Sequence, residues 1–195
     1  MKKQVFFTGL AIALTVLFVF MPVSASDLII RIYFDDIEGE DCVLYYATDI
    51  ENVFTQEKSV VSEIDCEQKL VEFRLDKSCD GHLTMLRLDL PQQAEQLVCI
   101  KNITVSSGGV IQKEYSPCEF FEDRNVDLLR EIEVTRVYPK KRTYLEIGPE
   151  DPYVVLSGEM TQELQSHFSH RGLSRLGLCM FIAGCYFISR KKIFA

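Results

Sequence analysis

Short segments in which apolar and polar residues alternate recur along most of this chain, and they limit the possible fold more than any other feature. In one of them, single charged residues separate the apolar side chains of Val71, Phe73 and Leu75. A period of two is typical of a strand with one buried face. We predict about eight or nine strands from this pattern. They cover residues 28–34, 42–46, 69–75, 83–90, 97–105, 110–111, 131–138, 144–147 and 153–156.

No segment between these strands has the period of a long helix, and polar turn residues separate most neighbouring strands. A parallel α/β fold needs helical crossovers, so this class is disfavoured. The Ser-Ser-Gly-Gly sequence at residues 106–109 predicts a β-hairpin. The predicted fold class is all-β, an antiparallel β-sandwich or jelly roll over residues 27–158. Residues 159–172 are expected to form a short helix or a juxtamembrane linker.

An uncharged apolar segment near the N-terminus predicts export. Two lysines precede it, residues 5–21 contain no charge, and Pro22 follows. The small residues at 23–25 form the kind of site that a signal peptidase cleaves. We predict a signal peptide over residues 1–25. An uncleaved signal anchor is the alternative, because about 17 apolar residues nearly span a bilayer.

A second apolar segment lies near the C-terminus, where residues 176–188 read LGLCMFIAGCYFI. Three basic residues follow at 190–192, and basic residues after a span stay in the cytoplasm. We predict a transmembrane helix over residues 173–189 and a cytoplasmic tail over residues 190–195. The protein would then be a single-pass cell-membrane protein whose main domain is extracytoplasmic. The alternative is a buried C-terminal helix of a soluble domain.

The acidic charge is concentrated between the two apolar segments. All 29 acidic residues lie between Asp27 and Glu163, and the formal net charge of the whole chain is -8. An acidic domain repels the phosphate backbone of DNA and RNA. Nucleic acid is therefore excluded as an expected partner.

Four short motifs resemble those of a known family. Residues 83–91 (LTMLRLDLP) are similar to an LxxLRxDP strand, and residues 45–55 (YYATDIENVFT) are similar to a tyrosine motif that precedes it. Residues 98–105 resemble an IxIxxIxV strand, and residues 151–156 (DPYVVL) resemble a late Asp-Pro motif. The family comprises carbohydrate-binding-module-like β-sandwich domains of bacterial cell-envelope glycan-associated membrane proteins. The resemblance implies an extracytoplasmic jelly roll associated with surface polysaccharide assembly, without a defined catalytic site.

Glycan recognition usually combines aromatic rings, which stack on sugar faces, with nearby carboxylates and other polar groups. The candidate ligand-binding residues are Tyr45, Tyr46, Arg87, Asp89 and Tyr115. Adjacent residues of a strand point to opposite faces, so at most one of Tyr45 and Tyr46 faces solvent. Arg87 and Asp89 share a face, and an ion pair between them is the competing interpretation.

Cysteine spacing indicates neither a zinc site nor a full disulfide framework. Five of the seven cysteines lie outside the predicted transmembrane helix, and no CxxC motif occurs. One disulfide among Cys66, Cys79 and Cys118, or no disulfide at all, is compatible with this spacing. The acidic segment at residues 35–41 could bind calcium through its carboxylates, but acidic runs of this kind more often form solvated loops. We predict no catalytic residues, no metal and no cofactor.

Two functions of different classes are compatible with these features. The first, which we favour, is a membrane-tethered module that is not an enzyme and binds cell-envelope polysaccharide or a protein partner. The second is an accessory structural subunit of a membrane-embedded glycan-assembly enzyme. In that case the C-terminal helix would dock on a membrane-protein partner through small residues, namely Gly177, Ala183 and Gly184.

Overall fold

The structure is a computed structural model, and it describes residues 26–37, 39–91 and 96–168. The predicted signal peptide, transmembrane helix and cytoplasmic tail lie outside these residues. Among the residues that are described, no helix is both long and apolar enough to cross a membrane.

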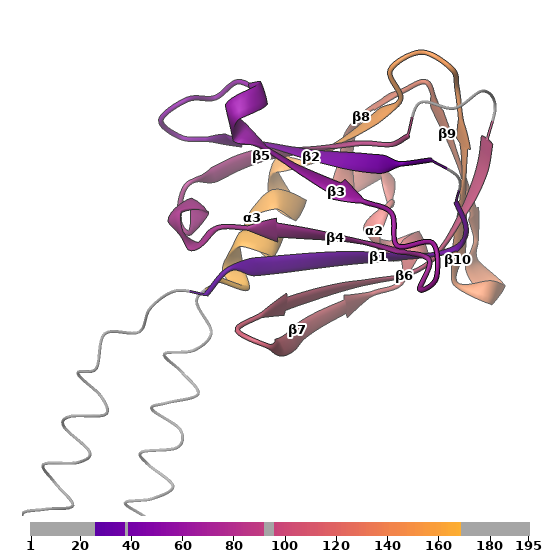
Figure 1. The fold of residues 1–195 in the computed structure, drawn as a ribbon, viewed down its shortest axis with the longest axis horizontal. Helices are drawn as coiled ribbons and strands as arrows, with labels where there is room; N and C mark the ends of the chain where they lie inside the picture. The colour runs from indigo at the N-terminus through magenta and orange to yellow at the C-terminus, as the bar shows by residue number, and fades with distance from the viewer. Residues whose placement is uncertain (1–25, 38, 92–95, 169–195) are drawn as a thin grey trace, which may run out of the picture. The chain divides into compact units, whose positions relative to one another are not determined.

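Two antiparallel sheets pack face to face in the described part of the chain (Figure 1). The first sheet has the strand order β4-β1-β6-β10-β9, and β7 also pairs with β6. Its strands are β1 (Leu28–Asp36), β4 (Leu70–Leu75), β6 (Gln96–Ser107), β7 (Val110–Tyr115), β9 (Ile132–Val137) and β10 (Arg142–Ile147). The second sheet has the order β3-β2-β5-β11-β8. Its strands are β2 (Asp41–Thr48), β3 (Ser59–Glu63), β5 (Leu83–Asp89), β8 (Val126–Arg130) and β11 (Tyr153–Leu156).

The predicted alternation produces the core between the two sheets. Along β1, every second residue from Leu28 to Phe34 is buried, and the residues between them are partly exposed. Phe73 on the neighbouring β4, and Leu86 and Leu88 on β5 of the second sheet, are buried in the same core. The two-sheet antiparallel β-sandwich that the sequence predicts is therefore confirmed.

The sequence did not predict β3 and β8. Each has only five residues. In β3 the apolar Val60 and Val61 are adjacent, and in β8 so are Leu128 and Leu129, so the period of two is lost. Pairing with β2 and with β11, respectively, places these strands in the sheet. Such pairing depends on residues far away in the sequence, which a local pattern does not contain.

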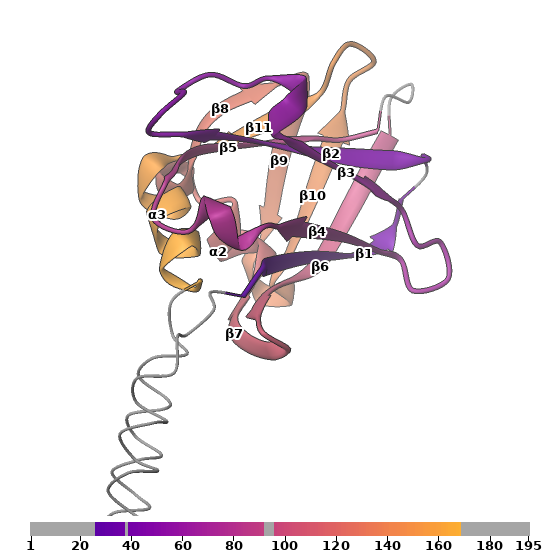
Figure 2. The same ribbon diagram turned by 60° about the vertical axis from the view of Figure 1, so that its left-hand side comes forward.

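Short helices lie between the strands. They are α2 (Pro117–Phe120), α3 (Gly158–Ser166), η1 (Gln56–Lys58), η2 (Lys77–Cys79), η3 (Asp123–Asn125) and η4 (Tyr138–Lys140). The longest is α3, which occupies part of the segment expected to be a helix or a linker, and it contacts β5 (Figure 2). Ser157 caps its N-terminus, and Met160, Leu164 and Phe168 are buried in the core of the sandwich. The core therefore extends beyond the last strand.

All five cysteines among the described residues are free thiols. Cys66 is exposed, whereas the other four are buried. Burial, together with the charge of Asp41, raises the pKa of Cys42 to about 12. The thiol of Cys118 donates to the carbonyl oxygen of Arg142 at 3.2 Å. Of the two interpretations of the cysteine spacing, the structure contains the one without a disulfide.

Candidate functional site

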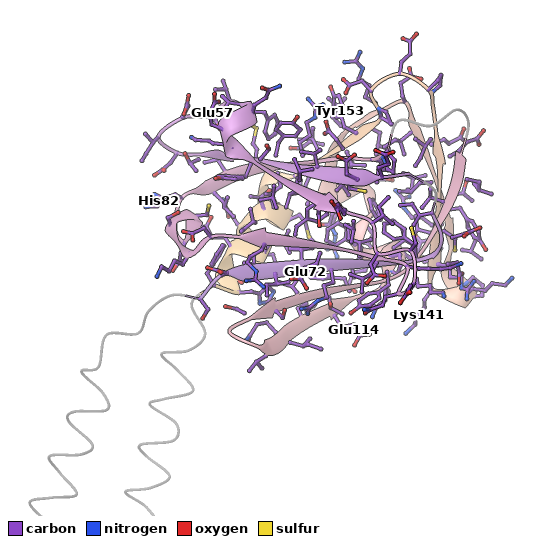
Figure 3. All side chains as sticks on the ribbon, in the orientation of Figure 1. Glu57, Glu72, His82, Glu114, Lys141 and Tyr153 are labelled. Atoms are coloured by element: carbon purple, nitrogen blue, oxygen red, sulfur yellow. The ribbon has the colours of Figure 1, made fainter. Side chains whose placement is uncertain are left out.

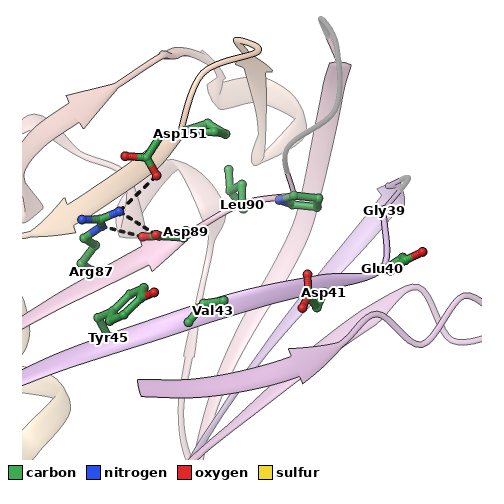
Figure 4. A pocket seen from close by; sticks show the side chains of 11 residues that line it. Gly39, Glu40, Asp41, Val43, Tyr45, Arg87, Asp89, Leu90 and Asp151 are labelled. Carbon is green, nitrogen blue, oxygen red and sulfur yellow. Dashed lines mark hydrogen bonds and ion pairs between the residues drawn. The ribbon is translucent and has the colours of Figure 1, made fainter. Parts of the chain in front are cut away.

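A polar groove lies on the outer face of the second sheet, over β2 and β5 (Figure 4). Its volume is about 540 Å³. The loop before β2, the segment at the end of β5 and the turn before β11 also contribute lining residues. The lining residues are Gly39, Glu40, Asp41, Val43, Tyr45, Arg87, Asp89, Leu90, Pro91, Asp151 and Pro152.

Strand alternation explains why polar side chains gather on this face. On β2, Cys42 and Leu44 are buried, which leaves Tyr45 on the outer face. On β5, Arg87 and Asp89 take outward positions between buried leucines. The register of the sheet then pairs Tyr45 with Arg87. Three residues that the sequence singled out are thus brought to one site.

Arg87 makes most of the polar contacts in this groove. Its Nε and Nη2 donate to the two carboxylate oxygens of Asp89, each at 2.6 Å, and Nη2 lies 3.4 Å from Oδ1 of Asp151 (Figure 4). The guanidinium carbon lies 3.8 Å from the ring centroid of Tyr153 and 5.3 Å from that of Tyr45. Two carboxylates and two aromatic rings therefore hold the guanidinium in one orientation.

Burial and charge act in opposite directions on this ion pair. Burial raises the pKa of Asp89, and the charge of Asp151 adds to that effect, whereas Arg87 works against it. For Arg87, burial opposes the charged form, but the hydrogen bonds and charge of Asp89 leave the guanidinium pKa above its ordinary value. The pair is therefore a partly desolvated one, in which each ion depends on the other.

The remainder of the groove is acidic. Glu40, Asp41, Asp89 and Asp151 contribute carboxylates, and Arg87 is the one cationic residue among the described residues that line it. Within the described part of the chain, Glu40 and Asp41 form no ion pair. A ligand in the groove therefore meets a surplus of negative charge and many oxygen acceptors.

The structure does not bring the other two candidate residues to this groove. Tyr46 belongs to β2 like Tyr45, but it packs against the core on the inner side of the sheet. Tyr115 lies at the end of β7 in the first sheet and is 1% exposed.

The sequence prediction missed Asp151 and Tyr153 as site residues. They lie beside the groove because β11 pairs with β5, which places Tyr153 opposite Asp89. Asp151 is 64 residues away from Arg87 in the chain. The only signal for this region was the Asp-Pro motif at residues 151–152, which the family resemblance had marked without giving it a role.

Tyr115 has a structural position. Its hydroxyl group donates to Oε1 of Glu163 at 2.8 Å and lies 3.4 Å from Nε2 of His167. Glu163 belongs to α3, and His167 is the residue that caps its C-terminus. These contacts therefore tie the helix to the end of β7. Burial and the carboxylate of Glu163 raise the pKa of Tyr115, which keeps the hydroxyl group protonated.

Tyr115→Phe is expected to lower the free energy of unfolding by about 1 kcal/mol, because Glu163 loses its hydrogen-bond donor. Urea denaturation followed by circular dichroism measures this change. Tyr138→Phe is the control, since the Tyr138 side chain is 61% exposed and should cost nothing measurable. Equal effects of the two substitutions would show that the contact with α3 does not stabilise the domain.

The acidic segment before β2 uses several of its carboxylates in protein contacts. Asp35 lies 2.7 Å from Nζ of Lys101 and accepts a hydrogen bond from Nη1 of Arg142, and these partners lower its pKa. Asp36 lies 3.2 Å from Nζ of Lys69. Among the residues that the structure describes, no group of three or more histidine, cysteine or acidic side chains could hold a metal ion.

No protein-family model, curated protein or solved structure matches this chain. A β-sandwich supports many unrelated functions, so the architecture alone assigns none. The functional conclusion therefore depends on the groove and on the side chains that line it.

Proposed function

We propose that this protein is a membrane-tethered, extracytoplasmic binding module whose groove holds a glycan of the cell envelope. In this proposal the sandwich is a carbohydrate-binding-module-like jelly roll, and it is not an enzyme. The observation that carries the proposal is the outward ring of Tyr45 beside the fixed Arg87–Asp89 pair in an open polar groove. The motifs at residues 45–55, 83–91 and 151–156 support the same conclusion, since each contributes to this groove.

The chemistry of a sugar suits such a surface. One face of a pyranose ring is apolar and stacks on an aromatic ring, while its hydroxyl groups need acceptors and donors at fixed positions. Tyr45 supplies the ring, and the carboxylates of Asp41 and Asp151 supply acceptors. The groove is open, so a polymer could enter and leave along its length.

The ion pair with Arg87 makes Asp89 unsuitable as the general acid of glycoside hydrolysis. Glycoside hydrolysis generally needs two carboxyl groups, one of which donates a proton to the leaving oxygen. Both oxygens of Asp89 accept hydrogen bonds from Arg87. Asp89 is therefore committed to an ion pair and does not serve as a proton donor.

The charge of the groove sets the kind of glycan that we expect. Its surplus of carboxylates repels polymers that carry phosphate or uronate groups. A neutral envelope polysaccharide should therefore bind more tightly than an anionic one. Binding of the full-length protein in mild detergent to an array of neutral and anionic envelope glycans tests this order. A flat signal across the array would contradict the proposal, and co-purification with a membrane enzyme would then favour the accessory-subunit function.

Tyr45→Ala is expected to weaken binding to the best neutral glycan by about tenfold, which corresponds to about 1.4 kcal/mol of lost stacking. Isothermal titration calorimetry on the full-length protein measures the change. Tyr138→Ala is the matched control, because that exposed tyrosine belongs to η4 and does not line the groove. If the two variants bind the glycan equally well, the groove is not the binding site.

A further inference from the structure

Exposed apolar side chains gather at one end of the described domain. Eight large apolar residues are exposed among the described residues, and four of them lie at the end where β1 begins. They are Ile50 and Val53 in the loop after β2, and Val110 and Ile111 at the start of β7. A soluble surface normally scatters such side chains singly, so their position requires a reason.

The chain enters the sandwich at the same end. Ser107 pairs with Leu28 on one side and with Val110 on the other. Since neighbouring strands are about 4.8 Å apart, Val110 lies about 10 Å from the start of β1. The hydroxyl group of Ser107 also donates to the carbonyl oxygen of Ser26, at 3.5 Å. The tip of the β6–β7 hairpin, residues 108–111, therefore stands beside the first described residue.

The chain leaves the sandwich here as well. Figures 1 and 2 both show the end of α3 beside the start of β1. Only four residues, 169–172, separate Phe168 from the predicted transmembrane helix. Fully extended, this connection spans at most about 18 Å. A domain tethered by that helix must keep this end close to the bilayer surface.

The hairpin tip suits a lipid surface better than the neighbouring loops do. Residues 106–112 contain no charge, and the exposed fractions of Val110 and Ile111 are 60% and 62%. The loop after β2, in contrast, carries Asp49, which pairs with His82, and Glu51, which pairs with Lys58. Figure 3 shows Glu57 and His82 on the side of this end where that loop lies.

We propose that the tip of the β6–β7 hairpin inserts Val110 and Ile111 into the interfacial region of the membrane that anchors the chain. The inference rests on the membrane tether of the proposed function and does not depend on glycan binding. The contact adds a second attachment to the tether, and it restricts how the sandwich is oriented above the lipid. Apolar side chains of this kind enter the boundary between headgroups and acyl chains without a requirement for lipid charge.

The absence of tryptophan from the whole chain provides a direct test. I111W introduces a single fluorophore at the tip. L97W is a matched control, because Ile111 and Leu97 are both 62% exposed. Leu97 lies at the opposite end of β6, about 33 Å from Ser107 along the strand. Each full-length variant is reconstituted into phosphatidylcholine vesicles, with and without acyl chains brominated near the headgroup.

The expected result is quenching of I111W that is about twofold or more stronger than that of L97W, with a blue shift of its emission. V110W should behave like I111W. Adding anionic phosphatidylglycerol should not increase the quenching, because the tip carries no charge. Equal quenching of I111W and L97W, or quenching that appears only with anionic lipid, would overturn the proposal.

Flotation of the same vesicles separates this inference from the proposed function. If the chain does not float with lipid, the tether fails and the hairpin contact fails with it. If the chain floats and binds glycan but I111W is not quenched, the hairpin contact alone is wrong.

Discussion

Arg87→Ala is expected to lower the free energy of unfolding by about 3 kcal/mol at neutral pH. The side chains of Arg87 and Asp89 are only 22% and 16% exposed. Without the guanidinium, the carboxylate of Asp89 stays largely desolvated and has no cation to compensate it, while the rings of Tyr45 and Tyr153 lose the group between them. Chemical denaturation of the full-length protein measures the change.

The pH dependence of this loss follows from the pKa of Asp89. Burial places that pKa above its ordinary value, so the folded state binds more protons than the unfolded state in the interval between the two values. Stability therefore falls as the pH rises from about 4, the ordinary aspartate value, through the raised pKa. Arg87 limits this interval because it lowers the pKa of Asp89. In the Arg87→Ala variant the decline should continue to higher pH and be larger.

Two further variants test whether the ion pair with Asp89 causes the stability loss and the pH dependence of Arg87→Ala. Arg87→Ala combined with Asp89→Asn should lose the additional pH dependence, since no carboxyl group remains to titrate at that position. Arg130→Ala is the matched control for a surface pair, because Arg130 is 53% exposed and lies 3.5 Å from Asp151. It should cost about 0.5 kcal/mol. If Arg87→Ala costs no more than Arg130→Ala, the ion pair in the groove is not important for stability.

Gly39→Ala is the second substitution for which we expect a large effect, about 3 kcal/mol of lost stability. The φ angle of Gly39 is +132°, a conformation that residues with a side chain rarely adopt. An added Cβ would also lie 2.4 Å from Cβ of Pro91, which is buried in the wall of the groove. Because Pro91 is rigid, the backbone on one side of the groove has to move.

Two other glycines separate the contribution of the φ angle from that of the close approach to Pro91. Gly109 has a φ of +79°, but an added Cβ would meet nothing within 4 Å, so Gly109→Ala should cost about 1 kcal/mol. Gly158 has no such φ and equally open space, and Gly158→Ala should be neutral or slightly stabilising. Denaturation midpoints of the three variants test this order. If Gly39→Ala lowers the stability no more than Gly109→Ala does, the backbone beside Pro91 moves at little cost in free energy.

Those strands whose buried face is encoded locally could be predicted from the sequence. Leu28 to Phe34 and Val71 to Leu75 repeat an apolar residue at every second position, and both became strands with one buried face. The pairing of β11 with both β5 and β8 could not be predicted, because it joins segments far apart in the chain. The order of strands in each sheet depends on such contacts.

The candidate site was predictable to the same extent. Arg87 and Asp89 share a face because they are two residues apart on one strand. The ion pair that this spacing suggested is present. Asp151 and Tyr153 reach the groove only through the pairing of β11 with β5. Tyr115 was a candidate because aromatic rings stack on sugar faces. An aromatic residue that anchors a helix to the core has the same local sequence, and Tyr115 occupies that second position.

The free thiols of the described domain have a practical consequence. Since no disulfide joins these residues, their folding requires no oxidant, and reducing agents should leave the sandwich intact. Burial shields four of the five sulfur atoms from bulky electrophiles, whereas Cys66 is accessible. Of these five cysteines, Cys66 alone, on the turn between β3 and β4, should therefore react with a maleimide dye in the native protein.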